Sequence, residues 1–542
     1  MFECVVNKGL RSLLLVASAG LWAGCASDST GVQPLPVTAS ANLVPGAFSL
    51  FNGAAISGAV EFPATDSARE YLVVGQLATA SPINPVAFSL GGQASLAHFR
   101  LTELASRPNV ATEFHRMLRR RGAEMAREAA LWGSVLRAPP PRAAPPTVGT
   151  KRTFKVCSSP TCQATKNVAA TALFVGTHAA IFVDDSAPAG GFTSADLAEI
   201  GSQFDTVLYP IDTDRFGPES DLDGNGVVIV LLTKQINALV PKPGCNTAFI
   251  TGFFYPGDIA PGFATQYNNG EVFYGMVPDP VGTVSCSYST NYVKRVIPVT
   301  FIHEFQHMIS FNQHVLVRGG NDEVLWLNEA MSHLAEELGG LHYDSLNIDT
   351  TASRFVIADL YNAGLFLADP EAVTVVAETG TGGLEERGAD WLLVRYLVDR
   401  FGPYTSRALE QTVLTGGPNV TAATGVAFET LLGQWLLALY VSDLPGFSAP
   451  PELRYTSWHF RATFASLNAQ DPQDFPFPFP LRPDSGNGQS AGFSSTLSAG
   501  SGAYLRVTQG TSSPAFALTF RGPNGGALPA SGKPQLAIVR VR

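Results

Sequence analysis

Hydrophobic positions along the chain change their spacing several times, and each spacing predicts a kind of element. Short apolar runs such as residues 71–74, separated by Gly, Pro and Asn, predict a small β-rich domain over residues 45–110. The next segment has helical spacing and stops at a run of prolines, which predicts a helix and a stiff linker over residues 111–149.

From residue 150 to 445 strand-like and helix-like segments alternate, which predicts one α+β domain. The predicted strands are 172–176, 180–184 and 227–232, and the segment from Ser194 to Phe204 predicts a helix. Residues 271–277 alternate as well, and two readings are open: an edge strand that pairs with an extended peptide, or an interior strand.

Beyond a Pro- and Phe-rich connection at 446–490, short apolar runs within 491–542 predict a C-terminal β-rich accessory domain. The expected fold class is therefore α+β, with a central domain flanked by small β-sandwich domains. Of the 542 residues, 45% are hydrophobic and 15% charged, which is typical of globular proteins.

The formal charge of −10 argues against nucleic acid as a partner, because phosphate binding needs a basic face. One local basic run exists, Arg119-Arg120-Arg121 with Arg116 and Arg127. Its helical spacing predicts a solvated helix face.

The first 25 residues have the pattern of an export signal. Lys8 and Arg11 precede an apolar run from Leu13 to Trp22, and small residues then lead to Cys25. That run is too short for a permanent membrane span. We therefore expect an exported protein.

Residues 21–25 resemble a bacterial lipobox, which implies a lipid on Cys25 and an outer-membrane or cell-surface location. Trp22 departs from the usual Leu, so cleavage without lipidation and release into the medium is the alternative. Residues 26–44 are rich in Ser, Thr, Pro and Ala and predict a flexible tether. Membrane contact is expected only through the lipid.

Four cysteines remain outside the signal segment, and an even number in an exported protein predicts disulfides. Three pairings are formally possible. Proximity along the chain favours Cys157 with Cys162, and Cys245 with Cys286.

The segment Asp221-Leu222-Asp223-Gly224-Asn225-Gly226 matches the first half of a calcium loop, with side-chain oxygens on Asp221, Asp223 and Asn225. Loop position twelve, which should be acidic, is Leu232 inside a predicted strand. Calcium binding and a plain Gly-rich turn therefore both remain open.

The segment from Thr300 to His314 predicts a helix with reactive side chains on one face. Residues four apart share a helix face, so His303 and His307 can present two imidazoles to one zinc ion. Glu304 beside them can accept a proton from a water molecule that zinc acidifies.

A catalytic zinc site needs a third protein ligand and one open position. A metzincin would supply a Gly and a His three and six residues after His307, where this chain has Ser310 and Gln313. Thermolysin-like gluzincins use a Glu on a following helix instead. Glu329, 22 positions after His307, fits that alternative.

The two segments 303–307 and 326–337 together resemble the hyicolysin family of secreted zinc metallopeptidases. The resemblance covers residues 150–445 and is most specific in these two helices. It implies a zincin-like catalytic domain that cleaves protein or peptide substrates.

By this resemblance His303, His307 and Glu329 hold one catalytic zinc, and Glu304 is the general base. Thermolysin-like enzymes often place an Asp at the position of His333. Here His333 is expected either to hydrogen-bond a zinc ligand or to be a core histidine, and the core is favoured. Asn328 either caps its helix or binds the substrate backbone, and capping is favoured. Tyr396 is either an oxyanion donor or a core residue, and the core is favoured. Glu336 and Glu337 are expected to be exposed.

Two functions from different classes follow. The first is a zinc metalloendopeptidase. The second is a catalytically degenerate surface lipoprotein that acts as an adhesin or binding protein through its β-rich domains. An intact Glu304 favours the enzyme, because a binding protein has no use for a general base.

Overall fold

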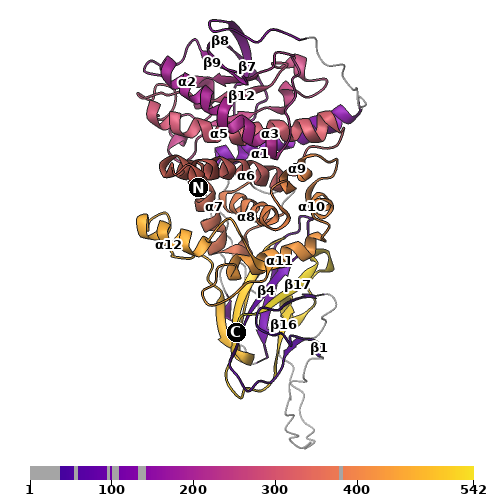
Figure 1. The fold of residues 1–542 in the computed structure, drawn as a ribbon. Helices are drawn as coiled ribbons and strands as arrows, with labels where there is room; N and C mark the ends of the chain where they lie inside the picture. The colour runs from indigo at the N-terminus through magenta and orange to yellow at the C-terminus, as the bar shows by residue number, and fades with distance from the viewer. Residues whose placement is uncertain (1–36, 54–58, 94–97, 100–108, 132–141, 377–381) are drawn as a thin grey trace, which may run out of the picture. The chain divides into compact units, whose positions relative to one another are not determined.

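The structure is a computed structural model that describes residues 37–53, 59–93, 98–99, 109–131, 142–376 and 382–542 (Figure 1). The expected signal segment with Cys25 lies outside these residues, as do residues 26–36 of the tether and 139–141 of the linker. From Val37 to Arg542 the chain forms one compact unit.

Strands from both ends of this unit form two sheets that face each other across a shared hydrophobic core. The strands are β1 (Val37–Ser40), β2 (Phe48–Asn52), β3 (Ala59–Phe62), β4 (Arg69–Leu77), β5 (Val86–Gly92), β6 (His98–Phe99), β13 (Asp484–Asn487), β14 (Gly492–Leu497), β15 (Gly502–Gln509), β16 (Phe516–Arg521) and β17 (Pro534–Arg540). One sheet has the order β1-β3-β16-β5-β14-β6 and the other β13-β15-β4-β17-β2.

The expectation of two separate β-rich domains, at 45–110 and at 491–542, is therefore wrong. β4 from the N-terminal region lies between β15 and β17 from the C-terminal region and pairs antiparallel with both. Alternation along a strand predicts which residues face a core, but it does not indicate which strand is the neighbour.

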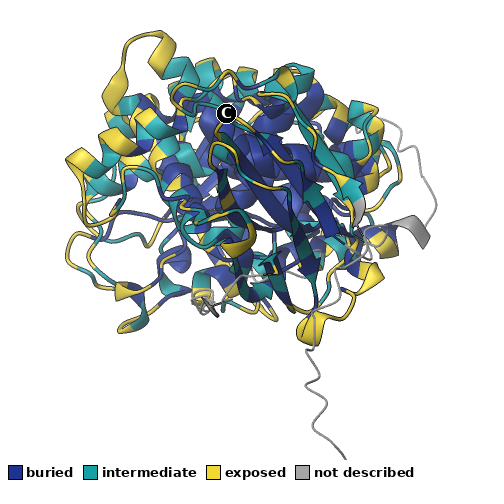
Figure 2. Cartoon of the chain, turned by 90° about the horizontal axis from the view of Figure 1, so that it is seen from below, coloured by how far each residue is buried: buried dark blue, intermediate teal, exposed yellow. Residues whose placement is uncertain are grey.

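The continuous apolar run in β4 is explained by burial on both faces. Tyr71 and Val73 face the core between the two sheets, whereas Leu72 and Val74 belong to the core formed with the helices. α11 (Phe428–Val441) lies on this outer face, where the hydroxyl of Tyr504 donates to the carbonyl of Leu436 at 2.8 Å. Figure 2 shows the strands in the middle of that view coloured as buried. A strand buried on both faces loses the polar alternation of a half-exposed strand.

A third sheet belongs to the central α+β region and consists of β7 (Lys151–Cys157), β8 (Thr165–Val175), β9 (Ala179–Asp184), β10 (Val228–Leu232), β11 (Gly252–Phe254) and β12 (Val272–Gly275). Their order is β11-β12-β10-β9-β8-β7, with β9, β10 and β12 parallel and β11 antiparallel at the edge. The alternating segment 271–277 thus contains an interior strand, and β11 is the edge strand instead.

Helices cover this sheet and continue to the sandwich (Figure 1). They are α1 (Val110–Leu131), α2 (Ser194–Gln203), α3 (Tyr209–Arg215), α4 (Lys234–Ala238), α5 (Thr290–Phe311), α6 (Leu325–Ser345), α7 (Asp349–Ala368), α8 (Leu384–Phe401), α9 (Thr405–Glu410), α10 (Gly416–Thr424) and α12 (Phe460–Gln470). α5 packs on the sheet, and the ring centroids of Phe301 in α5 and Phe273 in β12 are 4.4 Å apart. α6 contacts α5, α7 and α8.

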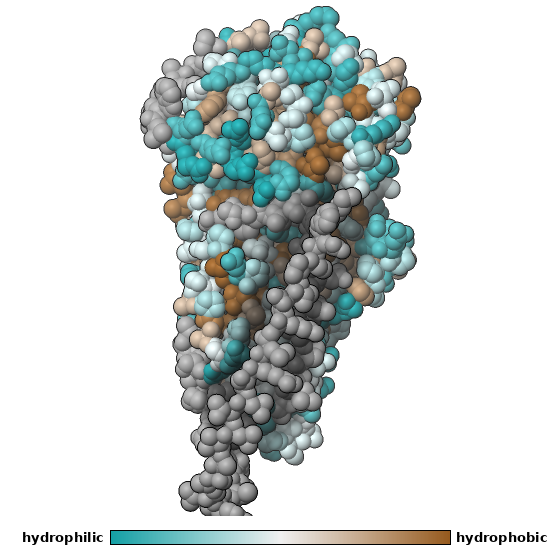
Figure 3. Space-filling model, turned by 180° about the vertical axis from the view of Figure 1, so that it is seen from behind, coloured by the Kyte–Doolittle hydropathy of each residue, from teal (hydrophilic) through white to brown (hydrophobic). Residues whose placement is uncertain are grey.

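The exposed positions of the strands also follow from which faces are covered. β8 alternates buried and exposed residues, as expected for a strand with one face in water. Polar side chains cover much of the upper part of the face in Figure 3, at the end of the unit where Figure 1 places β7, β8 and β9. Among the described helices no single one is long and apolar enough to cross a membrane, and α10 with α11 meets that test only as a pair bent by 84°.

Candidate metal centre

α5 presents the predicted zinc-binding face. Ser289 caps its first turn, with its hydroxyl accepting from the backbone N–H of Tyr292. His303 and His307 project from the same face, one turn apart, with their Nε2 atoms separated by 3.1 Å. Burial lowers the pKa of His307 well below its usual value, so this ring is neutral and offers a lone pair. Two imidazole nitrogens at this separation are suited to a shared cation.

α6 brings Glu329 to the same point. Its carboxylate oxygens lie 3.8 Å from Nε2 of His303 and 3.7 Å from Nε2 of His307. Zinc held at about 2.0–2.1 Å in tetrahedral geometry places its ligand atoms about 3.4 Å apart, so the three side chains fit one ion.

The carboxylate of Glu329 is only 2% exposed, and neither oxygen accepts a hydrogen bond from a described residue. Although burial opposes its ionisation, Arg387 and the two histidines lower the pKa of Glu329 well below its usual value. Nη1 of Arg387 lies 3.6 Å from this carboxylate. Buried, ionised carboxylates normally accept hydrogen bonds or bind a metal ion, so this carboxylate is suited to be a metal ligand.

Glu336, two turns after Glu329 along α6, orients His303. Nδ1 of His303 donates to its carboxylate at 2.6 Å, which leaves Nε2 free for a metal. Burial opposes ionisation of Glu336, but the charge of His333 and the hydrogen bond from His303 lower its pKa to about 2. On the other ligand, Oγ of Ser332 lies 2.9 Å from Nδ1 of His307.

His333 lies next to these residues, and with His303 and Glu336 it forms a second group of side chains that could hold a metal ion. Its Nδ1 lies 2.8 Å from Asp359 on α7 and 3.3 Å from Glu336. Burial alone would lower its pKa, but these two carboxylates outweigh that effect and raise it to about 10. A protonated His333 holds Glu336 in its ionised form.

Glu304, the predicted base, is 1% exposed and lies beside the two histidines. The backbone N–H of Phe254, in edge strand β11, donates to its carboxylate at 2.9 Å. Burial raises the pKa of Glu304, with partial opposition from His303 and Arg119. A raised pKa makes the carboxylate a stronger proton acceptor.

α1, placed by the sequence in a region before the catalytic domain, also reaches the site. Arg119 is 6% exposed and lies 3.9 Å from Glu304 and 3.8 Å from Glu329. Nδ1 of His115 lies 4.0 Å from Glu304. The expectation of a uniformly solvated basic face is therefore wrong for Arg119, although Arg120 is 65% exposed.

The sequence did not predict the positions of several residues that surround the metal ligands. Glu336 and Glu337 were expected to be exposed but are buried, and Glu337 accepts from Arg395 at 3.1 Å and from Trp391 at 3.0 Å. Asn328 does not cap α6, which begins at Leu325, and it instead accepts from Arg119 at 3.4 Å. A signal was available, since positions 329, 332, 333 and 336 are spaced as one helix face.

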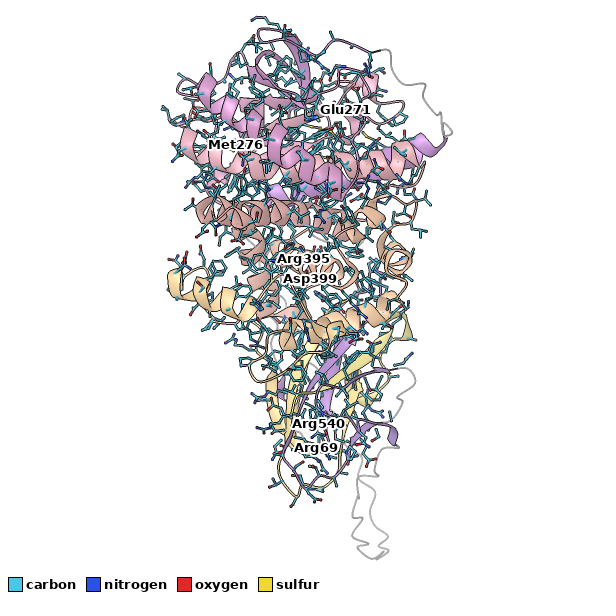
Figure 4. All side chains as sticks on the ribbon, viewed as in Figure 1. Arg69, Glu271, Met276, Arg395, Asp399 and Arg540 are labelled. Carbon is cyan, nitrogen blue, oxygen red and sulfur yellow. A yellow bond between two sulfur atoms is a disulfide. The ribbon has the colours of Figure 1, made fainter. Side chains whose placement is uncertain are left out.

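Tyr396 lies in the core, as expected, and its hydroxyl donates to the carbonyl of Glu452 at 2.7 Å. Figure 4 labels the neighbouring pair Arg395 and Asp399 on α8, whose charged groups are 3.2 Å apart. The ion pair lies within α8, whereas the hydrogen bond from Tyr396 to Glu452 joins α8 to a later segment of the chain.

The other predicted sites lie elsewhere in the α+β region. Both disulfides form with the expected pairing, Cys157–Cys162 and Cys245–Cys286. The loop with Asp221, Asp223 and Asn225 precedes β10, and the structure brings Glu271 to it, which the sequence did not indicate.

A buried His-Glu-His constellation with a Glu on the following helix defines the zinc-metallopeptidase type of site. No protein-family model matches the sequence. Over 147 residues the chain is 30% identical to the neutral metalloprotease ShpI of Staphylococcus hyicus. The aligned segment covers 27% of this chain and 31% of that protein. The chain thus matches less than a third of the length of this relative. The similarity is a distant homology and confirms the predicted resemblance to a hyicolysin-like metalloprotease.

Among solved structures, an M1 zinc metallopeptidase from Deinococcus radiodurans matches with 16% identity and a TM-score of 0.24 over 52% of this chain and 46% of that chain.

Proposed function

We propose that this protein is a zinc-dependent endopeptidase of the gluzincin type, with a zincin-like catalytic region. The observation that carries the proposal is the convergence of His303, His307 and Glu329 on one point, with Glu304 beside it. Two His and one Glu leave a fourth position open, which is the catalytic rather than the structural pattern.

The chain's own residues supply proton transfer and orientation. A zinc ion held by these residues would act as a Lewis acid and lower the pKa of a water molecule. Glu304 accepts the proton and passes it to the leaving amine, with the N–H of Phe254 fixing its carboxylate. Glu336 keeps Nε2 of His303 directed at the metal.

The substrate is a protein or peptide that adds as a strand to the edge of the sheet. β11 is antiparallel, lies at that edge and contacts α5, and its Phe254 binds Glu304. An extended peptide beside β11 would therefore run past the base and the metal. The ring of Phe114 on α1 packs against the ring of Phe253 in β11, with 4.9 Å between the ring centroids, so α1 lies beside this strand.

Hydrolysis of casein and of a quenched fluorescent peptide tests the function. We expect activity that 1,10-phenanthroline abolishes and that Glu304→Gln lowers by about 10²–10⁴-fold in kcat, with zinc still bound. Glu199→Gln, a 67% exposed residue on α2, is the matched control and should retain full activity. Activity that survives both treatments contradicts the mechanism. Stoichiometric zinc without hydrolysis of any peptide favours the adhesin or binding protein.

We propose that the mature protein is exported and held at the outer membrane or cell surface by a lipid on Cys25. The lipobox-like residues 21–25 support this location, and so do two disulfides, which persist in oxidising compartments. Labelled palmitate should enter the wild type and not Cys25→Ala. An unlabelled wild type that is found in the medium contradicts the anchor.

A further inference from the structure

The loop before β10 has the backbone of a cation-binding turn. Gly224 and Gly226 adopt positive φ values of 70° and 73°, which turn the chain so that side chains at alternate positions point inward. Asp221 accepts from the N–H of Gly226 at 3.1 Å, and Asn225 accepts from the N–H of Val227 at 2.7 Å. This geometry alone also suits an ordinary turn.

Glu271 supplies a second, independent observation. It directly precedes β12, which pairs in parallel with β10, and its carbonyl accepts from the N–H of Ile229 at 2.7 Å. This pairing holds its side chain beside the loop, so that carboxylate oxygens of Asp221, Asp223 and Glu271 lie within 4.8 Å of one another. Figure 4 shows Glu271 in the layer of the molecule that contains the sheet.

Only one of the two carboxylate oxygens of Glu271 accepts hydrogen bonds from described residues. The residue is 2% exposed, and Oε1 accepts from the N–H of Leu222 at 2.9 Å and from the hydroxyl of Ser220. Oε2 is buried and has no hydrogen-bond partner among the described residues. Arg152 contacts another member of the group, with its Nη1 3.9 Å from the carboxylate of Asp223. Buried carboxylate oxygens normally have a partner, so this oxygen is suited to a bound cation.

We propose that Asp221, Asp223, Asn225 and Glu271 bind one calcium ion. All four offer oxygen, which a hard cation prefers and zinc does not require. Glu271 takes the part of the acidic residue that is missing at loop position twelve, and a neighbouring strand supplies it instead of the loop. The irregular arrangement favours calcium over magnesium, which demands near-octahedral geometry.

The ion would join the loop that leads into β10 to the start of β12. Its four ligands are different residues from those that converge on the zinc position, so we expect the ion to affect stability rather than the chemistry of hydrolysis. This proposal does not depend on the proposed function.

Calcium binding by the full-length, zinc-loaded protein tests the proposal. After calcium is removed with BAPTA, we expect titration calorimetry to show one calcium per chain and Tm to rise by about 3 °C or more with calcium but not with equal magnesium. Glu271→Gln and Asp221→Asn should each weaken binding at least about 10-fold, with zinc content unchanged. Glu199→Gln is the control and should bind as the wild type does.

Asp221 is exposed, so its variant folds even if the Glu271 variant does not. The proposal is wrong if the wild type binds no calcium, if both variants bind it normally, or if magnesium raises Tm equally. None of these readouts involves peptide hydrolysis, so a failed calcium site and a failed peptidase are distinguishable.

Discussion

At the scale of single residues, the orientation of one imidazole depends on one carboxylate. Glu336 is the hydrogen-bond acceptor for Nδ1 of His303, so its loss frees the ring to rotate. We expect Glu336→Ala to weaken zinc binding about 10–100-fold. Glu336→Gln keeps an acceptor and should lose less. Competition with a chromogenic chelator measures both affinities, and equal losses would show that the hydrogen bond is not what matters.

A second residue makes stability depend on pH. The side chain of Asp212 in α3 is fully buried, its two carboxyl oxygens have no hydrogen-bond partner among the described residues, and burial raises its pKa well above the usual value. The folded state therefore binds the proton more tightly than the unfolded state does. Its contribution to stability is present below the unfolded pKa of about 4 and is lost as pH rises through the folded pKa.

Asp212→Asn removes this dependence. At pH 8 we expect the variant to be more stable than the wild type by roughly 1.4 kcal/mol for each unit by which the pKa is raised, with little difference at pH 4. Urea unfolding at several pH values measures this. The control is Asp214→Asn, because Asp214 is exposed and accepts no backbone N–H from the described residues. Asp205 would not serve, since its carboxylate accepts two backbone N–H groups. Parallel curves for wild type and Asp212→Asn would contradict the argument.

At the scale of elements, α1 contributes a buried positive charge to a site built by α5 and α6. Arg119→Met leaves Glu304 and Glu329 without that charge, and we expect the metal-free protein to lose about 3 kcal/mol. The zinc-bound form should lose less, because the ion supplies positive charge to Glu329. Arg120→Met, on the exposed side of the same helix, should change stability by less than about 0.5 kcal/mol. Equal effects of the two variants would contradict this account.

The same elements show how far the sequence predicts the site. Helical spacing and the chemistry of zinc ligands predicted His303, Glu304 and His307, which share one helix. The resemblance to gluzincins predicted Glu329 on the next helix. Arg119 is far away in the chain, and nothing in its spacing indicates that α1 packs on β11. Glu271 was missed for the same reason, since strand order decides which side chain stands beside the loop.

At the scale of the whole molecule, the sandwich joins the two ends of the described chain. β17 pairs with both β2 and β4, and β15 pairs with β4 from the other side. Without β4, the C-terminal strands of that sheet have no common neighbour.

We therefore expect residues 484–542, expressed alone, to be unfolded by circular dichroism. Deletion of residues 534–542 from the full chain exposes one edge of β4 and leaves β2 without its partner, so we expect rapid proteolysis of both ends of the chain, while the full-length protein resists it. The central region with α5 and α6 has its own sheet and should be cleaved last. Cooperative unfolding of the isolated C-terminal fragment would instead mean that it is a domain in its own right, as the spacing of its apolar residues predicts.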